Sequence, residues 1–299
     1  MTHIFIKFLK TIVFIAAYVF FASAVLAKDY KYDAFTVKIT GKGQPILLIP
    51  GATCSGDEWN ETVARYKDNY QCHIFTLAGY AGTAPLPNGP YLLTIKKEME
   101  QYIIDQKLDN VILIGHSIGG FLSLCIASEM KAHLQKVLVV DALPFYAATF
   151  NPNAADTFNE KQAQNMFEMY ARMDDKALKE NQMKTAKFLC RDSTKWDMIA
   201  TWGANSDRKT LAYTLAEMMG NDMRKKVGDV QVPVLILGAF CTVPEYTGFT
   251  YESVLKTYTE QYSACAKCTV HVANDRTKHF IMYDNPDWYF AEVDNFLKN

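Results

Sequence analysis

The sequence predicts an α/β fold, with a doubly wound, mostly parallel sheet, helices on both of its faces, and a helical cap inserted near the middle. Short apolar, β-branched runs alternate with helix-compatible stretches from residue 35 to the C-terminus, which is the pattern of a parallel sheet covered by helices. One segment, 143–228, interrupts the alternation because it contains no convincing strand. We therefore expect it to fold as a cap over the carboxyl edge of the sheet, where ligands bind in such folds.

Each element follows from its own apolar pattern. Strands are expected at residues 35–40, 45–49, 72–77, 111–114, 137–140, 232–237 and 268–272. Helices are expected at residues 57–68, 91–107, 118–131, 251–263 and 286–298, and within the cap at 158–173, 177–189 and 211–223. The cap is rich in methionine, which suits an apolar pocket roof that accepts varied shapes. A plain helical core explains the same spacing equally well.

The first 27 residues have the pattern of a secretory signal peptide. Lys7 and Lys10 precede an apolar stretch, and Val25 and Ala27 are the small residues of a cleavage site. We expect cleavage after Ala27 and a periplasmic or secreted protein without stable membrane insertion. An uncleaved anchor is the alternative, although the apolar stretch is short for a full span. We expect four divisions: the leader at 1–27, the first part of the core at 28–142, the cap at 143–228 and the second part of the core at 229–299.

Charge and motif content limit the partners. The net charge of −1 gives no reason to expect nucleic acid or an anionic membrane surface as a partner. The sequence contains no metal, nucleotide or flavin motif, so we expect no cofactor and a small-molecule substrate. The oligomeric state is left open.

The seven cysteines are an odd number, so at least one of them is unpaired. Cys72 and Cys125 fall in a predicted strand and a predicted helix and are expected to be core thiols. Cys265 and Cys268 have redox or metal-ligand spacing, but no second pair or histidine cluster accompanies them. We interpret them as structural, either bridged to Cys241 or closed on each other.

Ser117 is the candidate nucleophile. It lies in Gly115-His116-Ser117-Ile118-Gly119, after a predicted strand and before a predicted helix. In that context the serine occupies a sharp strand-to-helix turn that exposes its hydroxyl, and the flanking glycines leave room for the strained backbone. The alternative is a glycine-flanked serine in an ordinary loop of a parallel sheet.

Four landmarks give the chain a family resemblance. They are Ile49-Pro50-Gly51-Ala52 followed by Trp59, Gly79-Tyr80-Ala81-Gly82, the Ser117 turn, and Lys278-His279-Phe280-Ile281-Met282. On these, the chain resembles the α/β-hydrolase superfamily, specifically its capped, esterase-like members, over nearly its whole length after the leader. The resemblance implies an α/β-hydrolase fold.

His279 is the expected general base, because the resemblance places that residue after the final strand. A serine hydroxyl needs a base to take its proton, and histidine titrates in the right range. His73 and His271 lie in predicted strands, His133 lies at a helix end and His116 lies in the turn itself. The alternative for His279 is an ordinary surface-loop histidine.

The third member of the site is Asp141, at the end of the strand that follows the nucleophile helix. Many relatives carry the acid shortly after the penultimate strand, where this chain has Cys241 instead. A carboxylate at the Asp141 position can fix the imidazole tautomer and stabilise its cation. The alternative for Asp141 is a structural role at the cap hinge. The reserve candidate for the acid is Glu245.

Backbone N–H groups of Ala52 and Ile118 are expected to form the oxyanion hole, with the Thr53 hydroxyl as a further donor. These residues together predict a serine hydrolase that cleaves a carboxylic ester, or a related acyl bond, of a small to medium apolar substrate through an acyl-enzyme. The competing hypothesis is a non-catalytic protein of the same fold that binds a ligand or partner. Its support is the missing aspartate near Cys241.

Overall fold

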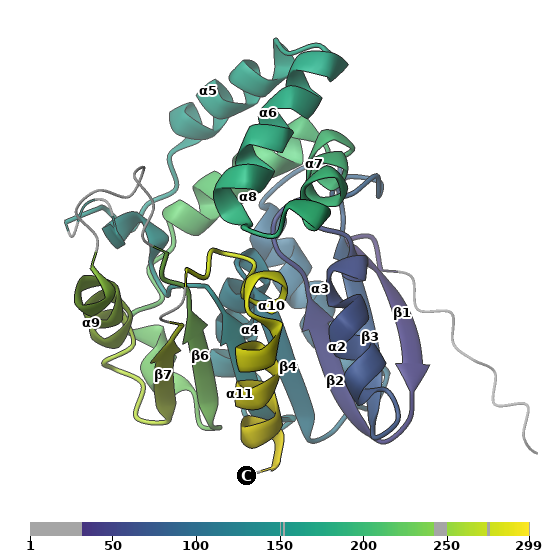
Figure 1. Ribbon diagram of the computed structural model, residues 1–299, viewed down its shortest axis with the longest axis vertical. Coiled ribbons are helices and arrows are strands. Elements are labelled where there is room, and N and C mark those ends of the chain that lie inside the picture. The colour runs from purple at the N-terminus through teal and green to yellow at the C-terminus, as the bar shows by residue number, and fades with distance from the viewer. Residues whose placement is uncertain (1–31, 150, 152, 242–249, 274–275, 299) are drawn as a thin grey trace, which may run out of the picture. The chain divides into compact units, whose positions relative to one another are not determined.

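The computed structural model describes residues 32–149, 151, 153–241, 250–273 and 276–298, and the expected leader at 1–27 lies outside them. This part of the chain contains a seven-stranded sheet in the order β1-β3-β2-β4-β5-β6-β7 (Figure 1). The strands are β1 Phe35–Gly41, β2 Gln44–Ile49, β3 Tyr70–Leu77, β4 Val111–His116, β5 Leu134–Val140, β6 Val234–Gly238 and β7 Cys268–Val272. Only the edge strand β1 pairs antiparallel, with β3. The other neighbouring pairs are parallel, so the predicted mostly parallel sheet is confirmed.

Helices cover both faces of this sheet. One face carries α2 Asn60–Tyr66, α10 Ile281–Asp284 and α11 Pro286–Lys298. The other carries α3 Tyr91–Asp105, α4 Ile118–Glu129 and α9 Tyr251–Gln261. Successive strand residues contribute to opposite cores: Leu113 packs with one and Ile114 with the other. This alternation is the two-residue period of a strand buried on both sides.

The central strands are mostly apolar because helices cover both of their faces. Every residue of β4 is buried, and so is every residue of β5 except Gln135. Burying each aliphatic side chain contributes about 1.5–3 kcal/mol. This burial gives the carboxyl ends of β4 and β5 a rigid support, and Ser117 and Asp141 follow those two ends.

The insertion between β5 and β6 is helical. It contains α5 Glu160–Ala171, α6 Asp175–Leu189, α7 Trp196–Ala204 and α8 Arg208–Met219. The three helices predicted here are present, whereas α7 was not predicted. Figure 1 shows these helices beyond the carboxyl ends of the strands.

The cap is attached to the core through α8. The carboxylate of Glu217 accepts hydrogen bonds from the backbone N–H groups of Tyr91 and Leu92, at 2.9 and 2.7 Å. These are the first residues of α3, whose N–H groups have no partner within the helix. The methionines of the cap differ in solvent exposure: Met218 and Met223 are buried, while Met169 is 46% exposed.

The cysteines follow one of the two predicted arrangements. Cys265 and Cys268 form a disulfide with each other, so the alternative bridge to Cys241 is wrong. Cys72 and Cys125 are buried free thiols, as predicted. Across the described ranges, no helix combines the length and apolar character needed to cross a membrane.

Candidate active site

Ser117 occupies a strained turn between β4 and α4. Its backbone has φ 53° and ψ −121°, a conformation that costs roughly 1–3 kcal/mol for a residue with a side chain. Two hydrogen bonds hold the turn: Ser117 N–H donates to the Val140 carbonyl at 2.9 Å, and Phe121 N–H donates to the Ser117 carbonyl at 3.0 Å.

Close backbone packing explains the two flanking glycines. A Cβ atom on Gly115 would lie 2.2 Å from the carbonyl oxygen of Gly119. A Cβ atom on Gly119 would lie 2.2 Å from the carbonyl oxygen of Ile49, at the end of β2. The turn therefore packs directly against the loop that follows β2, which contains the expected oxyanion donor Ala52. The second donor, Ile118, is the first residue of α4, so its N–H has no partner within that helix.

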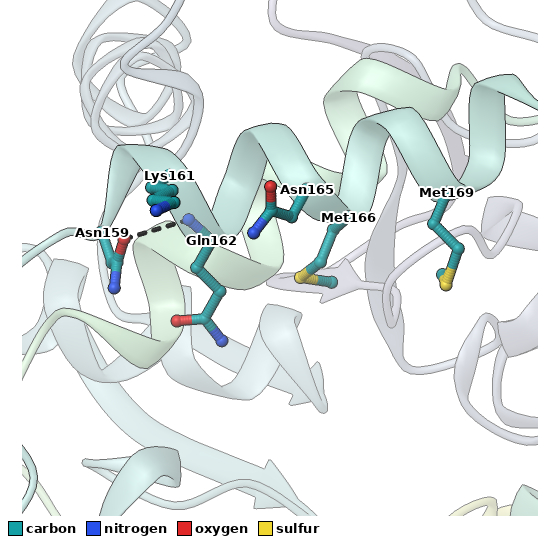
Figure 2. Close-up of a pocket in the computed structure, with 6 residues that line it drawn as sticks. All are labelled: Asn159, Lys161, Gln162, Asn165, Met166 and Met169. Atoms are coloured by element: carbon teal, nitrogen blue, oxygen red, sulfur yellow. Dashed lines mark hydrogen bonds between the residues drawn. The ribbon is translucent and has the colours of Figure 1, made fainter.

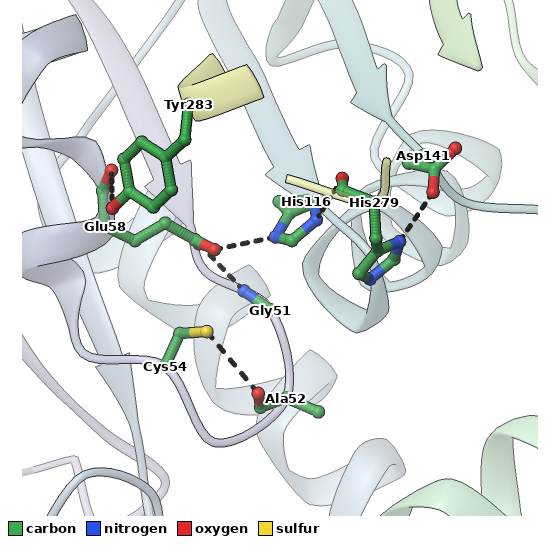
Figure 3. Close-up of polar contacts among 8 residues, drawn as sticks. All are labelled: Gly51, Ala52, Cys54, Glu58, His116, Asp141, His279 and Tyr283. Carbon is green, nitrogen blue, oxygen red and sulfur yellow. Dashed lines mark hydrogen bonds and ion pairs between the residues drawn. The ribbon is translucent and has the colours of Figure 1, made fainter. Parts of the chain in front are cut away.

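His279 and Asp141 lie in contact. Nδ1 of His279 is 2.6 Å from Oδ2 of Asp141 (Figure 3). The two side chains are 22% and 13% exposed, so the contact is largely shielded from solvent. With Nδ1 directed at the carboxylate, Nε2 is the ring nitrogen left for chemistry.

Asp141 is itself firmly held. Its Oδ1 accepts hydrogen bonds from the Tyr258 hydroxyl at 2.6 Å and from the Ala239 N–H at 2.8 Å. Burial acts to raise the pKa of Asp141, but the hydrogen bonds from His279, Tyr258 and Ala239 outweigh it. The pKa of Asp141 therefore lies below its ordinary value, and the group is a carboxylate at neutral pH.

The base lies beside the nucleophile's turn. The ring centroids of His279 and His116 are 4.5 Å apart, and His116 directly precedes Ser117. Within the described residues, the Ser117 side chain makes no hydrogen bond, and none joins it to His279. Such contacts are often long in a free enzyme and shorten when substrate binds. The reserve acid, Glu245, lies outside the described residues.

Sequence reasoning missed a second buried acid–histidine pair. Oε1 of Glu58 is 2.7 Å from Nδ1 of His116, and Oε2 accepts a hydrogen bond from the Gly51 N–H at 3.0 Å (Figure 3). The hydroxyl of Tyr283 donates to the backbone carbonyl of Glu58 at 3.0 Å. In the sequence, Glu58 follows another acidic residue in a polar stretch, so nothing marked it as buried.

An open, shallow surface cavity of about 460 Å³ lies elsewhere, along the cap helix α5. The residues that line it are Asn159, Lys161, Gln162, Asn165, Met166 and Met169 (Figure 2). None of the predicted catalytic residues borders this cavity. In the described ranges, no group of three or more histidine, cysteine, aspartate or glutamate side chains is arranged to hold a metal ion.

Known proteins share this architecture. Residues 46–292 match the family described as "Alpha/beta hydrolase family". The pimeloyl-[acyl-carrier protein] methyl ester esterase of Vibrio cholerae serotype O1 is 25% identical over 111 residues, which are 37% of this chain and 42% of that protein. The protein of the same name from Legionella pneumophila (strain Paris) is 21% identical over 260 residues, 86% of this chain and 97% of that protein. This chain matches about half of the length of the Vibrio proteins of this name.

Solved structures are similar over a greater length. The enol-lactonase of Burkholderia xenovorans LB400 has a TM-score of 0.71 at 14% identity and covers 89% of this chain and 96% of its own. The bromoperoxidase of Bacillus anthracis also has a TM-score of 0.71, at 18% identity, and covers 89% of this chain and 95% of its own. At these identities the similarity shows the fold alone.

Proposed function

The chain belongs to the alpha/beta hydrolase family, and on that premise we propose that it is a serine hydrolase that cleaves a carboxylic ester, or a related acyl bond, of a small to medium apolar substrate. The observation that carries the proposal is the 2.6 Å contact between His279 and Asp141 beside the strained Ser117 turn. A nucleophile, a base and a group that orients the base are the parts that acyl transfer requires.

In the proposed mechanism, the Ser117 hydroxyl attacks the substrate carbonyl while Nε2 of His279 accepts its proton. The Asp141 carboxylate stabilises the resulting imidazolium through the contact at Nδ1. The N–H groups of Ala52 and Ile118 donate to the oxyanion of the tetrahedral intermediate. His279 then returns the proton to the leaving alcohol, and water hydrolyses the acyl-enzyme by the same sequence of steps.

The names of the relatives support an ester or lactone as the substrate. Proteins called methyl ester esterases match by sequence, and an enol-lactonase matches by fold. The methionine-rich composition of the cap is the reason for proposing an apolar acyl group. The competing hypothesis of a non-catalytic binding protein depended on the missing acid near Cys241. Because Asp141 lies against His279, no described feature favours that alternative.

A serine-reactive fluorophosphonate tests the proposal. We expect covalent labelling at Ser117, identified by peptide mass spectrometry, and hydrolysis of p-nitrophenyl esters whose rate depends on acyl length. Heat-denatured protein is the control, because it keeps the hydroxyl and loses the activated geometry. A folded sample that neither labels nor turns over any ester would contradict the proposal and favour a binding protein.

We also propose that the protein is exported and that its mature form begins at Lys28. The support is the signal-like pattern of residues 1–27, which lie outside the described part of the chain. Intact-mass measurement of the protein isolated from its native host is expected to match residues 28–299. A mass that includes Met1, found in the cytoplasmic fraction, would contradict export.

A further inference from the structure

The Glu58–His116 pair lies beside the proposed triad but is not part of it, and it is completely enclosed. Its side chains are 0% and 1% exposed, respectively. Glu58 lies in the short helix η1 Gly56–Trp59, and His116 is the last residue of β4. Burying two ionisable groups is costly unless their polar atoms are paired, so the position calls for an explanation beyond packing.

The partners of the pair connect two halves of the active site. Glu58 accepts the Gly51 N–H, which belongs to the loop that holds the oxyanion donor Ala52. His116 directs its other ring nitrogen, Nε2, at the backbone carbonyl of His279, at 3.1 Å. One chain of hydrogen bonds thus runs from the oxyanion loop, through His116 next to Ser117, to the loop of the base.

The hydrogen count of the pair follows from these partners. A backbone carbonyl is only an acceptor, so Nε2 of His116 must carry a hydrogen. The 2.7 Å contact between Nδ1 and Oε1 needs a second hydrogen between the two atoms. The pair therefore holds two hydrogens and is neutral as a whole, whereas a separate carboxylate and a neutral imidazole would hold one.

We propose that Glu58 and His116 are positioning residues that, as a neutral pair holding two hydrogens, fix the oxyanion loop and the His279 loop relative to Ser117. This inference rests on the proposed hydrolase function. The pair touches no reacting atom. Its effect is to keep donors and base in the geometry that the transition state requires, where a displacement of about 1 Å can cost about 10²-fold in rate.

The electrostatic surroundings agree with this hydrogen count. Burial acts to lower the pKa of His116, but Glu58, the charge of Asp141 and the carbonyl of His279 outweigh it and raise that pKa. Other titratable groups also face the pair. The His279 ring lies 4.5 Å from the His116 ring, and Tyr289 interacts with the charge of Glu58. The buried Cys54 thiol has its pKa raised by burial and by Glu58, and the Tyr283 hydroxyl donates to the Glu58 backbone carbonyl. The pKa of His116 is therefore higher in the folded than in the unfolded state. Protonation of His116 contributes fully to the free energy of unfolding below its unfolded pKa of about 6.5, and this contribution is lost as the pH rises through the higher folded pKa.

Two substitutions separate positioning from mere packing. In Glu58→Gln, the amide oxygen can accept the Gly51 N–H while the amide nitrogen donates to Nδ1 of a neutral His116. The Nε2 hydrogen bond to His279 then survives, so we expect kcat within a few-fold of wild type. In Glu58→Ala, both connections are lost, and we expect kcat to fall by about 10²-fold with little change in KM.

Glu217→Ala is the control, because Glu217 is a partly buried carboxylate that likewise accepts backbone hydrogen bonds, from two N–H groups at the junction of α8 and α3. It is expected to lower the midpoint of thermal unfolding while kcat per folded molecule stays near wild type. Suppose that the wild type labels with fluorophosphonate and that Glu58→Ala and Glu217→Ala have equal kcat values. That result would overturn the positioning proposal and leave the hydrolase function standing.

Nitrogen-15 NMR of histidine-labelled protein gives a readout that does not depend on activity. At pH 7 we expect both ring nitrogens of His116 to be protonated in the wild type and only one in Glu58→Gln, with the resonance assigned by its loss in His116→Gln. One protonated nitrogen on His116 together with an ionised Glu58 carboxylate, the latter read from carbon-13 NMR of glutamate-labelled protein, would overturn the neutral pair. If Glu58→Ala fails to fold, the glutamine variant and this spectrum still decide the question. A wild type that never labels, yet shows two N–H groups on His116, would contradict the hydrolase function while the pair itself stands.

Discussion

Ser117→Ala is expected to reduce ester hydrolysis by about 10⁴-fold or more while the fold is retained. The hydroxyl is the proposed attacking atom, so its loss removes the covalent step. Among the described residues the Ser117 side chain makes no hydrogen bond, so removing its oxygen breaks no stabilising contact. The measurement is kcat/KM on the best p-nitrophenyl ester, with circular dichroism and thermal unfolding to check the fold.

Two further variants complete this experiment. His279→Ala is expected to lose a comparable factor, because a nucleophile and its base act as a unit. Ser128→Ala is the matched control: the Ser128 hydroxyl is buried at the end of α4 and donates to the Cys125 carbonyl at 2.8 Å, away from the site. It is expected to keep near-native turnover. Near-native turnover in Ser117→Ala or His279→Ala would remove that residue from the mechanism.

The parts of the molecule that could be predicted from the sequence are those set by local pattern. Apolar and β-branched runs predicted all seven strands. The apolar run is continuous in a central strand such as β2 or β6, whose faces are both buried, whereas the edge strands β1 and β7 are partly exposed and include polar residues. Boundaries were less accurate where polar residues belong to a strand. β5 begins at Leu134, before the predicted start at residue 137, and includes Lys136. The ammonium of Lys136 donates to the carbonyls of Phe296 and Leu297 at the end of α11, a long-range contact with no local signal.

Two short helices also escaped prediction. α7 has nine residues, and α10 has four. A helix this short presents too few turns for its apolar spacing to stand out. Their positions are set by packing: Ile199 of α7 and Ile281 of α10 are buried in the same core.

The candidate site likewise contains some residues that the sequence predicts and others that it does not. A motif marked Ser117 and His279, and the position of Asp141 at a strand end gave reason to expect it near His279, where the structure has it at 2.6 Å. Glu58 and Tyr258 had no such signal, since each reaches the site from a helix and contacts a residue more than fifty positions away. The roles of all these residues in turnover stay predictions.

Asp141→Asn is expected to lower kcat by about 10³–10⁴-fold, because an amide can hold the wrong imidazole tautomer and cannot stabilise the imidazolium. The variant keeps the size of the side chain, and its amide oxygen can still accept from Tyr258 and Ala239. The control is Asp294→Asn on α11, because the pKa of Asp294 is also lowered, chiefly by its hydrogen bond with Arg65, at a site remote from His279. Near-wild-type kcat in Asp141→Asn would assign the orientation of His279 to another acid.

The pH dependence of stability gives an independent check on the same residue. The folded pKa of Asp141 is depressed, because the hydrogen bonds from His279, Tyr258 and Ala239 outweigh the effect of burial. Its contribution to the free energy of unfolding is therefore present above its unfolded pKa of about 3.9 and is lost as the pH falls through the lower folded value. An asparagine side chain cannot titrate, so Asp141→Asn is expected to be less stable than wild type at pH 6, with a difference that shrinks below pH 4. A difference that stays constant from pH 6 to pH 3 would mean that the Asp141 charge is not what holds His279 in place.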